Sequence, residues 1–400
     1  MLRRTPSSLG RLAAAALLSG CAGDAAPPTL DVTVDTVAGV LHVRNPAEAP
    51  AWVARETVRI GTTALLEGAP APDEFGRVRA VVADEEGRVY VADATTAEVR
   101  VFGPDGAFER TIGSEGQGPG ELTSAYAVGW VGDTLAVFDG GGARVNLYGP
   151  DGTYLDQIRT MNVSGGEWFV RIAPGGWIPT PTPQGGPLGR AHRARILGGV
   201  AGTDTLPVPR APDGAPPSGI LCRFSNAIAF YTIPFAPTLA SAPDPNPPGA
   251  HAVAWTATYA VARLDVRGDT LRVVHRIVPT HPVSDAEWAA GMAEYEAREE
   301  THGNPGDCEP ASVTRPDRKP PIHRLHFDHE GRLIVERNVA DGTAYDLYDA
   351  QGRIRGTVPA PPHRDEVPPF FRNDHVYVVE VDSLDVPRVV GYRLVPADPD

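Results

Sequence analysis

The sequence predicts an all-β fold, for three reasons. Short runs of alternating apolar and polar residues dominate the chain, and patterns typical of amphipathic helices are nearly absent. Glycine (43 residues) and proline (41 residues) are abundant while 42% of the residues are hydrophobic, which indicates a turn-rich folded chain. Paired hairpin turns recur along the chain, and four short strands in each unit of about 45 residues predict a β-propeller.

The repeat is clearest at its hairpin turns. The two turns of a unit lie 19, 20 and 21 residues apart, at residues 87 and 106, 132 and 152, and 331 and 352. Turns of second hairpins are predicted near Gly106, Gly152, Gly202, Gly268 and Gly352. A sixth unit, 376–395, ends one strand short, and Thr57–Leu66 could supply that strand and close the ring. We therefore predict six blades over residues 51–397, whereas five or seven blades would need a different reading of residues 160–250.

One insertion, residues 280–318, departs from the strand pattern. Ser284 and Glu287 have the spacing of a capping box ahead of a helix. Trp288, Met292 and Tyr295 follow at helical spacing and form one apolar stripe. The helix can serve as a fixed cover over the blades or as a mobile lid.

The N-terminus predicts export. Arg3, Arg4 and Arg11 flank an apolar run that is too short to span a bilayer but suits a secretory signal. Leu18-Ser19-Gly20-Cys21 follows and resembles the lipobox of bacterial lipoproteins. The resemblance implies that residues 1–20 are a signal peptide and that Cys21 carries lipid, with 21–50 as a tether and possible first strand. An ordinary signal peptide with a chance cysteine is the alternative.

The net charge and the two other cysteines indicate which partners and which cellular compartment suit the chain. Loss of the three leader arginines takes the formal charge from −14 to −17, which argues against nucleic acid as a partner. No aspartate follows Cys21, so in a Gram-negative cell the chain resembles lipoproteins bound to the outer membrane, and the resemblance implies its periplasmic face or the cell surface. In that oxidising setting we expect a Cys222–Cys308 disulfide, with two buried thiols as the alternative. We expect a monomer that meets the membrane through its lipid.

Blade one carries a family resemblance. Residues 75–106 resemble an NHL-type repeat, and the loop 112–122, with its Gly-Pro-Gly-Glu sequence, is similar to that of six-bladed β-propeller lipoproteins of TolB-like architecture. The likeness extends over residues 75–155 and 320–395. It implies the propeller fold and no single activity.

No motif predicts catalysis. The Gly-rich loop Gly113–Gly120 lacks the lysine and helix of a phosphate-binding loop and is expected to be a crossover between blades. We predict no cofactor and no metal site, with zinc at His323, His326 and His329 as one alternative. Alternation along a strand would place His326 on the face opposite to the other two. Calcium at strand-end aspartates is the other alternative, and the aspartates are expected to cap turns: Asp84, Asp93 and Asp139.

Ligands of propellers usually lie at one end of the central axis, among the loops that enter the innermost strands. The candidate ligand-binding residues at that end are Phe75, Arg77, Tyr126, His323, Arg324, Phe371 and Arg372. Aromatic and arginine side chains are effective recognition groups. We therefore expect an envelope-anchored, non-enzymatic binding or scaffold propeller with an unknown ligand. The alternatives are a metal-dependent hydrolase or lyase acting at the axis, and a sugar or lactone sensor.

Overall fold

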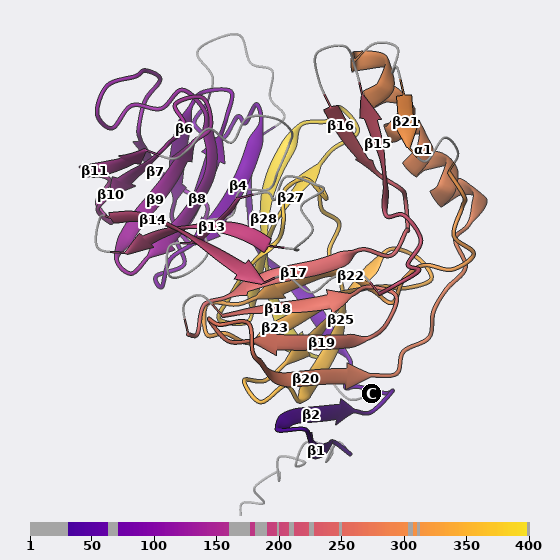
Figure 1. Cartoon of the computed structure of the whole chain (residues 1–400). Coiled ribbons are helices and arrows are strands. Elements are labelled where there is room, and N and C mark those ends of the chain that lie inside the picture. Colours follow the sequence, from indigo (N-terminus) through magenta and orange to yellow (C-terminus); the bar gives the residue numbers. More distant parts are fainter. Residues whose placement is uncertain are drawn as a thin grey trace, which may run out of the picture. The chain divides into compact units, whose positions relative to one another are not determined.

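The computed structural model describes residues 31–62, 71–159, 177–180, 190–197, 200–207, 212–223, 228–247, 250–302, 307–309 and 313–397. These residues belong to one compact unit that begins at Asp31. They form 28 strands and one helix, and the strands build a β-propeller (Figure 1). The predicted fold class is confirmed.

Three blades share one plan, in which four antiparallel strands pair in chain order. Blade one contains β4 (Val78–Ala83), β5 (Val89–Asp93), β6 (Glu98–Phe102) and β7 (Phe108–Ile112). Blade two contains β8 (Ala125–Val131), β9 (Thr134–Asp139), β10 (Arg144–Tyr148) and β11 (Tyr154–Arg159). Blade five contains β22 (Ile322–Phe327), β23 (Leu333–Asn338), β24 (Thr343–Tyr348) and β25 (Ile354–Pro359). The predicted turn glycines have positive φ, which glycine adopts without strain: Gly87, Gly106, Gly132, Gly152, Gly331 and Gly352.

Blades three and four lie where the sequence repeat is weakest. Blade three shows β12 (Trp177–Thr180), β13 (Arg190–Leu197) and β14 (Val200–Pro207). Blade four contains β17 (Leu239–Asp244), β18 (Ala250–Trp255), β19 (Ala260–Leu264) and β20 (Thr270–Arg276). The turn near Gly268 is confirmed between β19 and β20. The hairpin predicted around Gly202 is present as β13 and β14, but the chain reverses between Leu197 and Val200, so Gly202 itself lies inside β14 opposite Arg195.

The sixth blade is closed by the N-terminal part of the chain. Its own strands are β26 (Phe370–Arg372), β27 (His375–Val381) and β28 (Pro387–Pro396). The outer strand is β3 (Trp52–Ile60), which pairs antiparallel with β28. This confirms the predicted ring closure, although the strand begins at Trp52 rather than at Thr57. The two ends of the propeller sequence are thus joined within one sheet.

Residues ahead of β3 extend this connection to two more blades. The hairpin β1 (Thr33–Val37) and β2 (Val40–Asn45) adds to blade four, where β2 runs parallel to β20. The chain then passes the outer strand of blade five, where Thr357 donates its N–H to the carbonyl of Pro50 at 2.8 Å. We call residues 33–60 the N-terminal strap, because they lie along the outer edges of blades four, five and six.

Two long crossovers, before and after blade four, combine into a small cap (Figure 1). The cap consists of β15 (Gly219–Arg223), β16 (Ile228–Thr232), β21 (Asp307–Glu309) and the helix α1 (Asp285–His302). The predicted capping box is present. Ser284 Oγ donates a hydrogen bond to the Glu287 carboxylate at 2.7 Å and accepts one from the Glu287 backbone N–H at 3.2 Å. Trp288 packs against a buried cluster that includes Ile220 and Cys222. β15 pairs with β21 so that Cys222 lies directly opposite Cys308.

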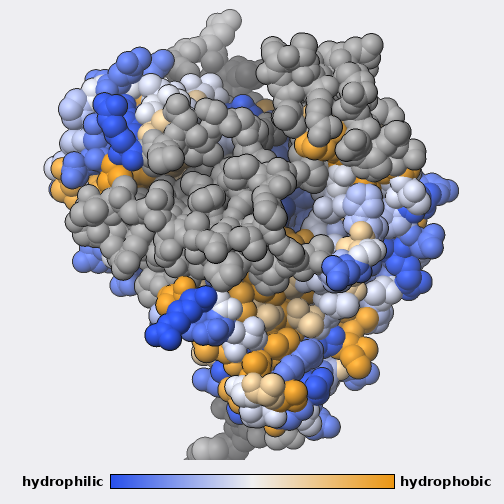
Figure 2. Space-filling model, in the orientation of Figure 1, coloured by the Kyte–Doolittle hydropathy of each residue, from blue (hydrophilic) through white to orange (hydrophobic). Residues whose placement is uncertain are grey.

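Buried apolar clusters join the sheets of neighbouring blades. One cluster contains Val91 of blade one and Val379 of blade six, and another contains Tyr90 of blade one and Val137 of blade two. Burial of this kind contributes about 25 cal/mol per Å² of apolar area removed from water. Polar residues cover much of the described surface, and apolar side chains show over the sheet of blade four (Figure 2).

Candidate functional site

The second strand of several blades ends in a polar residue that holds the segment entering the first strand. Asp93 accepts N–H bonds from Gly76 and Arg77 at 2.9 and 3.0 Å. The same position is taken in other blades by Asp139, Thr256 and Asn338, which bind residues 123–124, Thr238 and Pro320. These contacts define one end of the blades, here called the loop end. The predicted turn-capping role of Asp93 and Asp139 is therefore confirmed.

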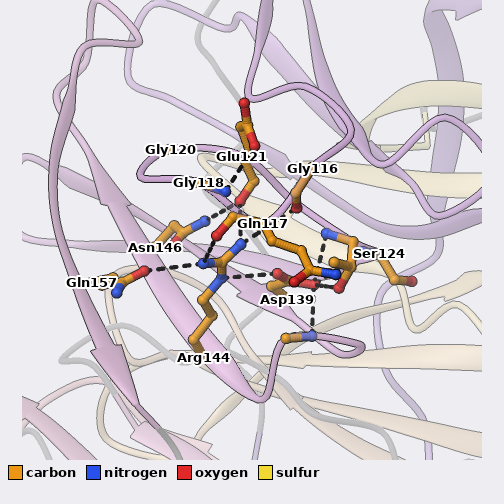
Figure 3. A network of polar contacts seen from close by, with 12 residues as sticks. Gly116, Gln117, Gly118, Gly120, Glu121, Ser124, Asp139, Arg144, Asn146 and Gln157 are labelled. Carbon is orange, nitrogen blue, oxygen red and sulfur yellow. Dashed lines mark hydrogen bonds and ion pairs between the residues drawn. The ribbon is translucent and has the colours of Figure 1, made fainter.

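The Gly-rich loop belongs to this fastening system. Arg144 is buried, and its guanidinium donates to Asp139 and to the backbone carbonyls of Gln117 and Glu121 at 3.0, 2.9 and 2.9 Å (Figure 3). The loop thus directs carbonyl oxygens at a cation of its own chain, and a phosphate would be repelled there. This matches the expected crossover between β7 and β8.

The first strand carries a β-bulge in blades one, two and five. The bulges place an extra residue at the same position of each blade, and these residues are Arg79, Tyr126 and His323. The Arg79 guanidinium lies over the Tyr126 ring, 4.7 Å from its centre. A bulge breaks the alternation of side chains along a strand. His323 therefore lies near the same cluster as His326, and the prediction that they occupy opposite faces is wrong.

Blade five has a buried carboxylate at its loop end. Glu336 is fully buried, and its Oε2 lies 3.0 Å from Nε2 of His326. Its Oε1 accepts a hydrogen bond from the Thr343 hydroxyl at 3.0 Å and lies 3.4 Å from Nε2 of His363. Burial alone would raise the pKa of Glu336, but hydrogen bonds from His326 and His363 bring it well below its usual range. Glu336 is thus a buried anion with two imidazole partners.

The contacts of His363 favour its protonated form. Its Nδ1 lies 3.0 Å from the Pro361 carbonyl, which can only accept, so Nδ1 holds a proton. Its Nε2 faces Glu336 at 3.4 Å and Asp365 at 3.9 Å, which places a lone pair against two carboxylates unless it too is protonated. Burial lowers the pKa of His363, but Glu336 outweighs burial and raises it above the ordinary value.

The cluster continues to the surface through Asp365. The Asp365 side chain is 67% exposed, and one oxygen lies 3.5 Å from Nε2 of His323. His323 holds the pKa of Asp365 below its ordinary value. Arg324 donates to the backbone carbonyl of Asp365 at 3.1 Å and so fastens the crossover between β25 and β26. Charged groups therefore run from solvent to the interior of blade five.

A tyrosine forms the apolar wall of the cluster. Tyr345 is fully buried, its ring is tilted against His363 at 6.4 Å, and Phe371 meets it edge-on at 5.1 Å. The Tyr345 hydroxyl has no hydrogen-bond partner among the described residues. Burial and the nearby Glu336 raise its pKa well above the usual value, so the hydroxyl keeps its proton. The site therefore offers donors, acceptors and one buried hydroxyl without a partner.

The arrangement suits polar recognition better than metal binding. Among the described residues, no three His, Cys, Asp or Glu side chains converge in a geometry that could hold a metal ion. In blade five the imidazole nitrogens point at separate oxygens of Glu336 rather than at one point. His329, the third histidine of the sequence pattern, lies in the turn after Asp328 at the other end of β22.

The structure brings together three of the seven candidates from the sequence: His323, Arg324 and Phe371. Tyr126 lies with Arg79 on blades one and two. Arg77 is exposed at the start of blade one. Phe75 is buried against Phe102 at 5.8 Å and packs inside blade one.

Arg372 lies at the wrong end for an axial ligand at the loops. Its guanidinium bonds the Ala83 carbonyl and the Glu85 carboxylate at 3.2 Å each, beside the Asp84–Gly87 turn. Arg372 therefore joins blade six to blade one at the end opposite the loop end. A small pocket beside it, lined by Arg332, Arg355 and Asp374, also lies at that end.

Sequence reasoning missed Glu336, Tyr345, His363 and Asp365. Glu336 had a usable signal, because a glutamate follows three consecutive apolar residues of a buried strand, Leu333–Val335. A buried ionisable residue needs a partner, and one histidine lies on the neighbouring strand. His363 and Asp365 lie in a proline-rich crossover whose path the sequence pattern does not predict.

Comparison with known proteins agrees with this fold. The DUF5128 family, described as a 6-bladed beta-propeller, matches residues 74–164, which is about a quarter of the chain. No curated protein sequence matches the chain. In the described part of the chain, no helix has the length and apolar character required to cross a bilayer.

Several solved structures are similar over most of their length. A Bacteroides vulgatus member of the DUF4221 family is 10% identical, covers 88% of this chain and 100% of its own, and has a TM-score of 0.45. A Bacteroides fragilis protein described as exported is 11% identical, with the same coverage and a TM-score of 0.44. Virginiamycin B lyase from Staphylococcus aureus is 10% identical, with 84% and 98% coverage and a TM-score of 0.39. At these scores the likenesses carry no argument about activity.

Proposed function

Taking the six-bladed propeller as the starting point, we propose that this chain is an exported, lipid-anchored protein that binds a polar ligand at the loop end of blade five. The binding site consists of His323, Arg324, Tyr345, His363 and Asp365. Binding proceeds without chemical change of the ligand.

One observation carries the proposal. The buried Tyr345 hydroxyl lacks a hydrogen-bond partner among the residues that the structure describes, while Asp365 and part of His323, in the same cluster, are accessible to solvent. A buried polar group left unpaired costs about 1–3 kcal/mol, so such a group is rarely retained without a partner. The comparable polar groups at the loop ends of blades one and two, Asp93, Asp139 and Arg144, are occupied in fastening loops. Compared with blades one and two, blade five therefore keeps polar groups that a ligand can engage.

Binding accounts for the cluster better than acid–base catalysis does. Both oxygens of Glu336 contact residues of the blade itself, so the carboxylate orients His326 and His363. A buried, fully engaged carboxylate of this kind is a positioning group. The half-buried His323 imidazole and the exposed Asp365 carboxylate are of opposite type and suit a ligand that both donates and accepts hydrogen bonds.

The sequence also supports a proposed location at the cell envelope. Lipid on Cys21 would anchor the chain to the cell envelope, and several acyl chains give a durable anchor because each buried methylene contributes about 0.8 kcal/mol. In a Gram-negative cell the protein would lie on the periplasmic face of the outer membrane or on the cell surface. A disulfide between Cys222 and Cys308 suits that compartment, and we propose a monomer.

Thermal unfolding of the mature chain with a panel of neutral saccharides, short peptides and dicarboxylates tests the proposal. A ligand that binds only the folded state raises the melting temperature. The increase should be lost in His323→Ala and reduced in Tyr345→Phe. It should persist in His375→Ala, which changes a histidine at the opposite end of blade six. Equal losses in all three variants would place the binding site elsewhere.

Metal analysis of the same protein tests the main alternative, a metal-dependent hydrolase or lyase. Zinc or calcium at one equivalent per chain, retained through dialysis, would overturn the binding proposal in favour of a metal-dependent hydrolase or lyase. A panel compound that is consumed rather than bound would have the same consequence. We expect neither result.

A further inference from the structure

The cap and the blade-five cluster meet at one buried lysine. Lys319 is 2% exposed and lies between the cap and β22. Its ammonium contacts the Glu287 carboxylate of α1 and donates to the carbonyls of Val339 and Ala340 at 3.1 Å each. The Phe235 ring, from the segment after β16, lies 5.9 Å away. One side chain thus joins both crossovers of the cap to the loop between β23 and β24.

That loop is part of the cluster on blade five. It connects Asn338, the last residue of β23, with Thr343, the first residue of β24. Glu336 lies three residues before the loop, and Thr343 donates its hydroxyl to Glu336 across it at 3.0 Å. Glu336 in turn faces His363 at 3.4 Å. The position of the loop therefore sets the distance between the buried carboxylate and His363.

We propose that Lys319 is a positioning residue, through which the cap holds the 339–342 loop and thereby the Glu336–His363 pair. The inference rests on the proposed function in taking the blade-five cluster as the binding site. It assigns the cap a task in positioning the cluster, because a shift of α1 would move Glu287, then Lys319, then the loop. The ammonium is fully engaged by three acceptors from two different parts of the fold, so it can transmit such a shift.

Helix α1 has a second attachment that serves as a matched control. Arg315 donates to the Asp285 carboxylate at 2.6 Å and contacts the Val283 carbonyl, both at the start of the same helix. These partners belong to the insertion rather than to blade five. Replacing Arg315 should loosen the helix start about as much as replacing Lys319, while leaving the 339–342 loop in place.

The test is an NMR titration of His363 in the mature full-length chain, assigned with His363→Gln. In Lys319→Met the loop loosens, Glu336 withdraws, and the His363 midpoint should fall by about 0.5 pH unit or more, since a one-unit change corresponds to about 1.36 kcal/mol. Loss of the Lys319 charge by itself would raise the midpoint or leave it unchanged, because a positive charge disfavours protonation of an imidazole, whereas Glu336 and Asp365 favour it. The sign therefore separates positioning from a direct charge effect.

Three further variants serve as the rescue, the control and the substitute in this titration. Lys319→Arg should restore the midpoint, and Arg315→Gln should leave it unchanged. If Lys319→Met does not fold, Glu287→Gln replaces it, because glutamine retains the capping box and removes the charge that Lys319 binds. An unchanged or raised His363 midpoint in folded Lys319→Met or Glu287→Gln would overturn the proposal. The test needs no ligand, so failure of the binding proposal leaves its outcome unaffected.

Discussion

The indole of Trp52 lies on the guanidinium of Arg355, 4.9 Å from the ring centre, and its Nε1 donates to the Arg355 carbonyl at 3.2 Å. Trp52 begins β3, the closing strand of blade six, whereas Arg355 belongs to blade five. The pair therefore fastens the strap to two blades at once. Cation–π contacts of this kind contribute about 0.5–1 kcal/mol or more.

Trp52→Ala should destabilise the protein by about 3–5 kcal/mol, the usual cost of removing a large buried aromatic side chain. Trp52 is 8% exposed and packs with Val358 and Leu394 in the cluster between the two blades. Urea denaturation followed by circular dichroism measures the change. Arg59→Gln, on the same strand but in an exposed ion pair with Glu56, should cost less than about 1 kcal/mol. Equal losses in both variants would refute the role given to Trp52.

Stability should depend on pH through Glu336 and His363. The pKa of Glu336 is lowered, so its contribution is present above the unfolded value and is lost as pH falls through the folded value. The pKa of His363 is raised, so its contribution is present below the unfolded value and is lost as pH rises through the folded value. The pair therefore contributes fully between about pH 4.3 and 6.5. Urea midpoints across pH 3–9 measure this window.

Glu336→Gln tests the cause of the His363 shift. Without the carboxylate, burial dominates, and the His363 pKa should fall below its ordinary value of about 6.5. The stability of this variant should also lose its dependence on pH above 6.5. Glu330→Gln changes an exposed acid in the turn of the same blade and should leave the His363 titration as it is. A His363 midpoint still raised in Glu336→Gln would contradict the assignment.

Arg144→Met should cost about 3–5 kcal/mol, because it leaves Asp139 buried without its ion-pair partner and frees the carbonyls of the Gly-rich loop. Asp139 is fully buried, and hydrogen bonds from Thr123, Gly142 and Ser124 lower its pKa despite burial. Hydrogen exchange should show new opening of residues 116–122. Arg110→Gln, at the exposed edge of blade one, is the control and should leave this loop protected.

A disulfide between Cys222 and Cys308 should be found when the protein is digested without reduction and its peptides are weighed. The two residues face each other across β15 and β21, which is a register that allows the bond. Closing a loop of this length stabilises by roughly 4–5 kcal/mol in the chain-entropy model. Cys222→Ser should therefore lower stability under oxidising conditions and have little effect after reduction. Two free thiols in the mass map would exclude the bond.

Cys21→Ala should release the protein from membranes. Lipid attached to Cys21 is the proposed anchor, and without the cysteine no acyl chains can be added there. Fractionation of cells that express the variant and the parent chain measures the difference. Ser19→Ala, which keeps the cysteine, should leave the protein in the membrane fraction. A Cys21→Ala variant that still sediments with membranes would disprove the anchor.

The propeller was predictable because its repeat is carried by local chemistry. Asp84 and Asp328 each cap a turn that ends in Gly-Arg, accepting the N–H of Arg88 and Arg332 at 2.8 Å, and such turns can be recognised in one sequence. Ring closure by residues near Thr57 followed from counting strands. The turn was placed at Gly202 because sequence alone does not distinguish a glycine inside a strand from a glycine in a turn. Only the pairing of Gly202 with Arg195 shows that it lies inside the strand.

The binding cluster was predictable only in part. His323 and Arg324 precede a recognisable strand, so their place at the loop end followed from the repeat. Their grouping with His326 depended on a bulge, which shifts side chains by one position and leaves no clear sequence signal. Arg372 was assigned to the wrong end because β26 has only three residues and its direction across the blade could not be read from its pattern.

The strap also determines how mechanical load from a tethered N-terminus would enter the fold. Tension on residues before Thr33 reaches the β1–β2 hairpin first and then the parallel ladder between β2 and β20. The hydrogen bonds that Arg276 donates to the carbonyls of Pro46 and Ala47, at 3.2 and 2.9 Å, resist the tension next. The strand that closes the ring comes last. A pull on the anchor would therefore first break contacts with blade four. The pairing of β3 with β28, which closes the ring, would be reached only afterwards.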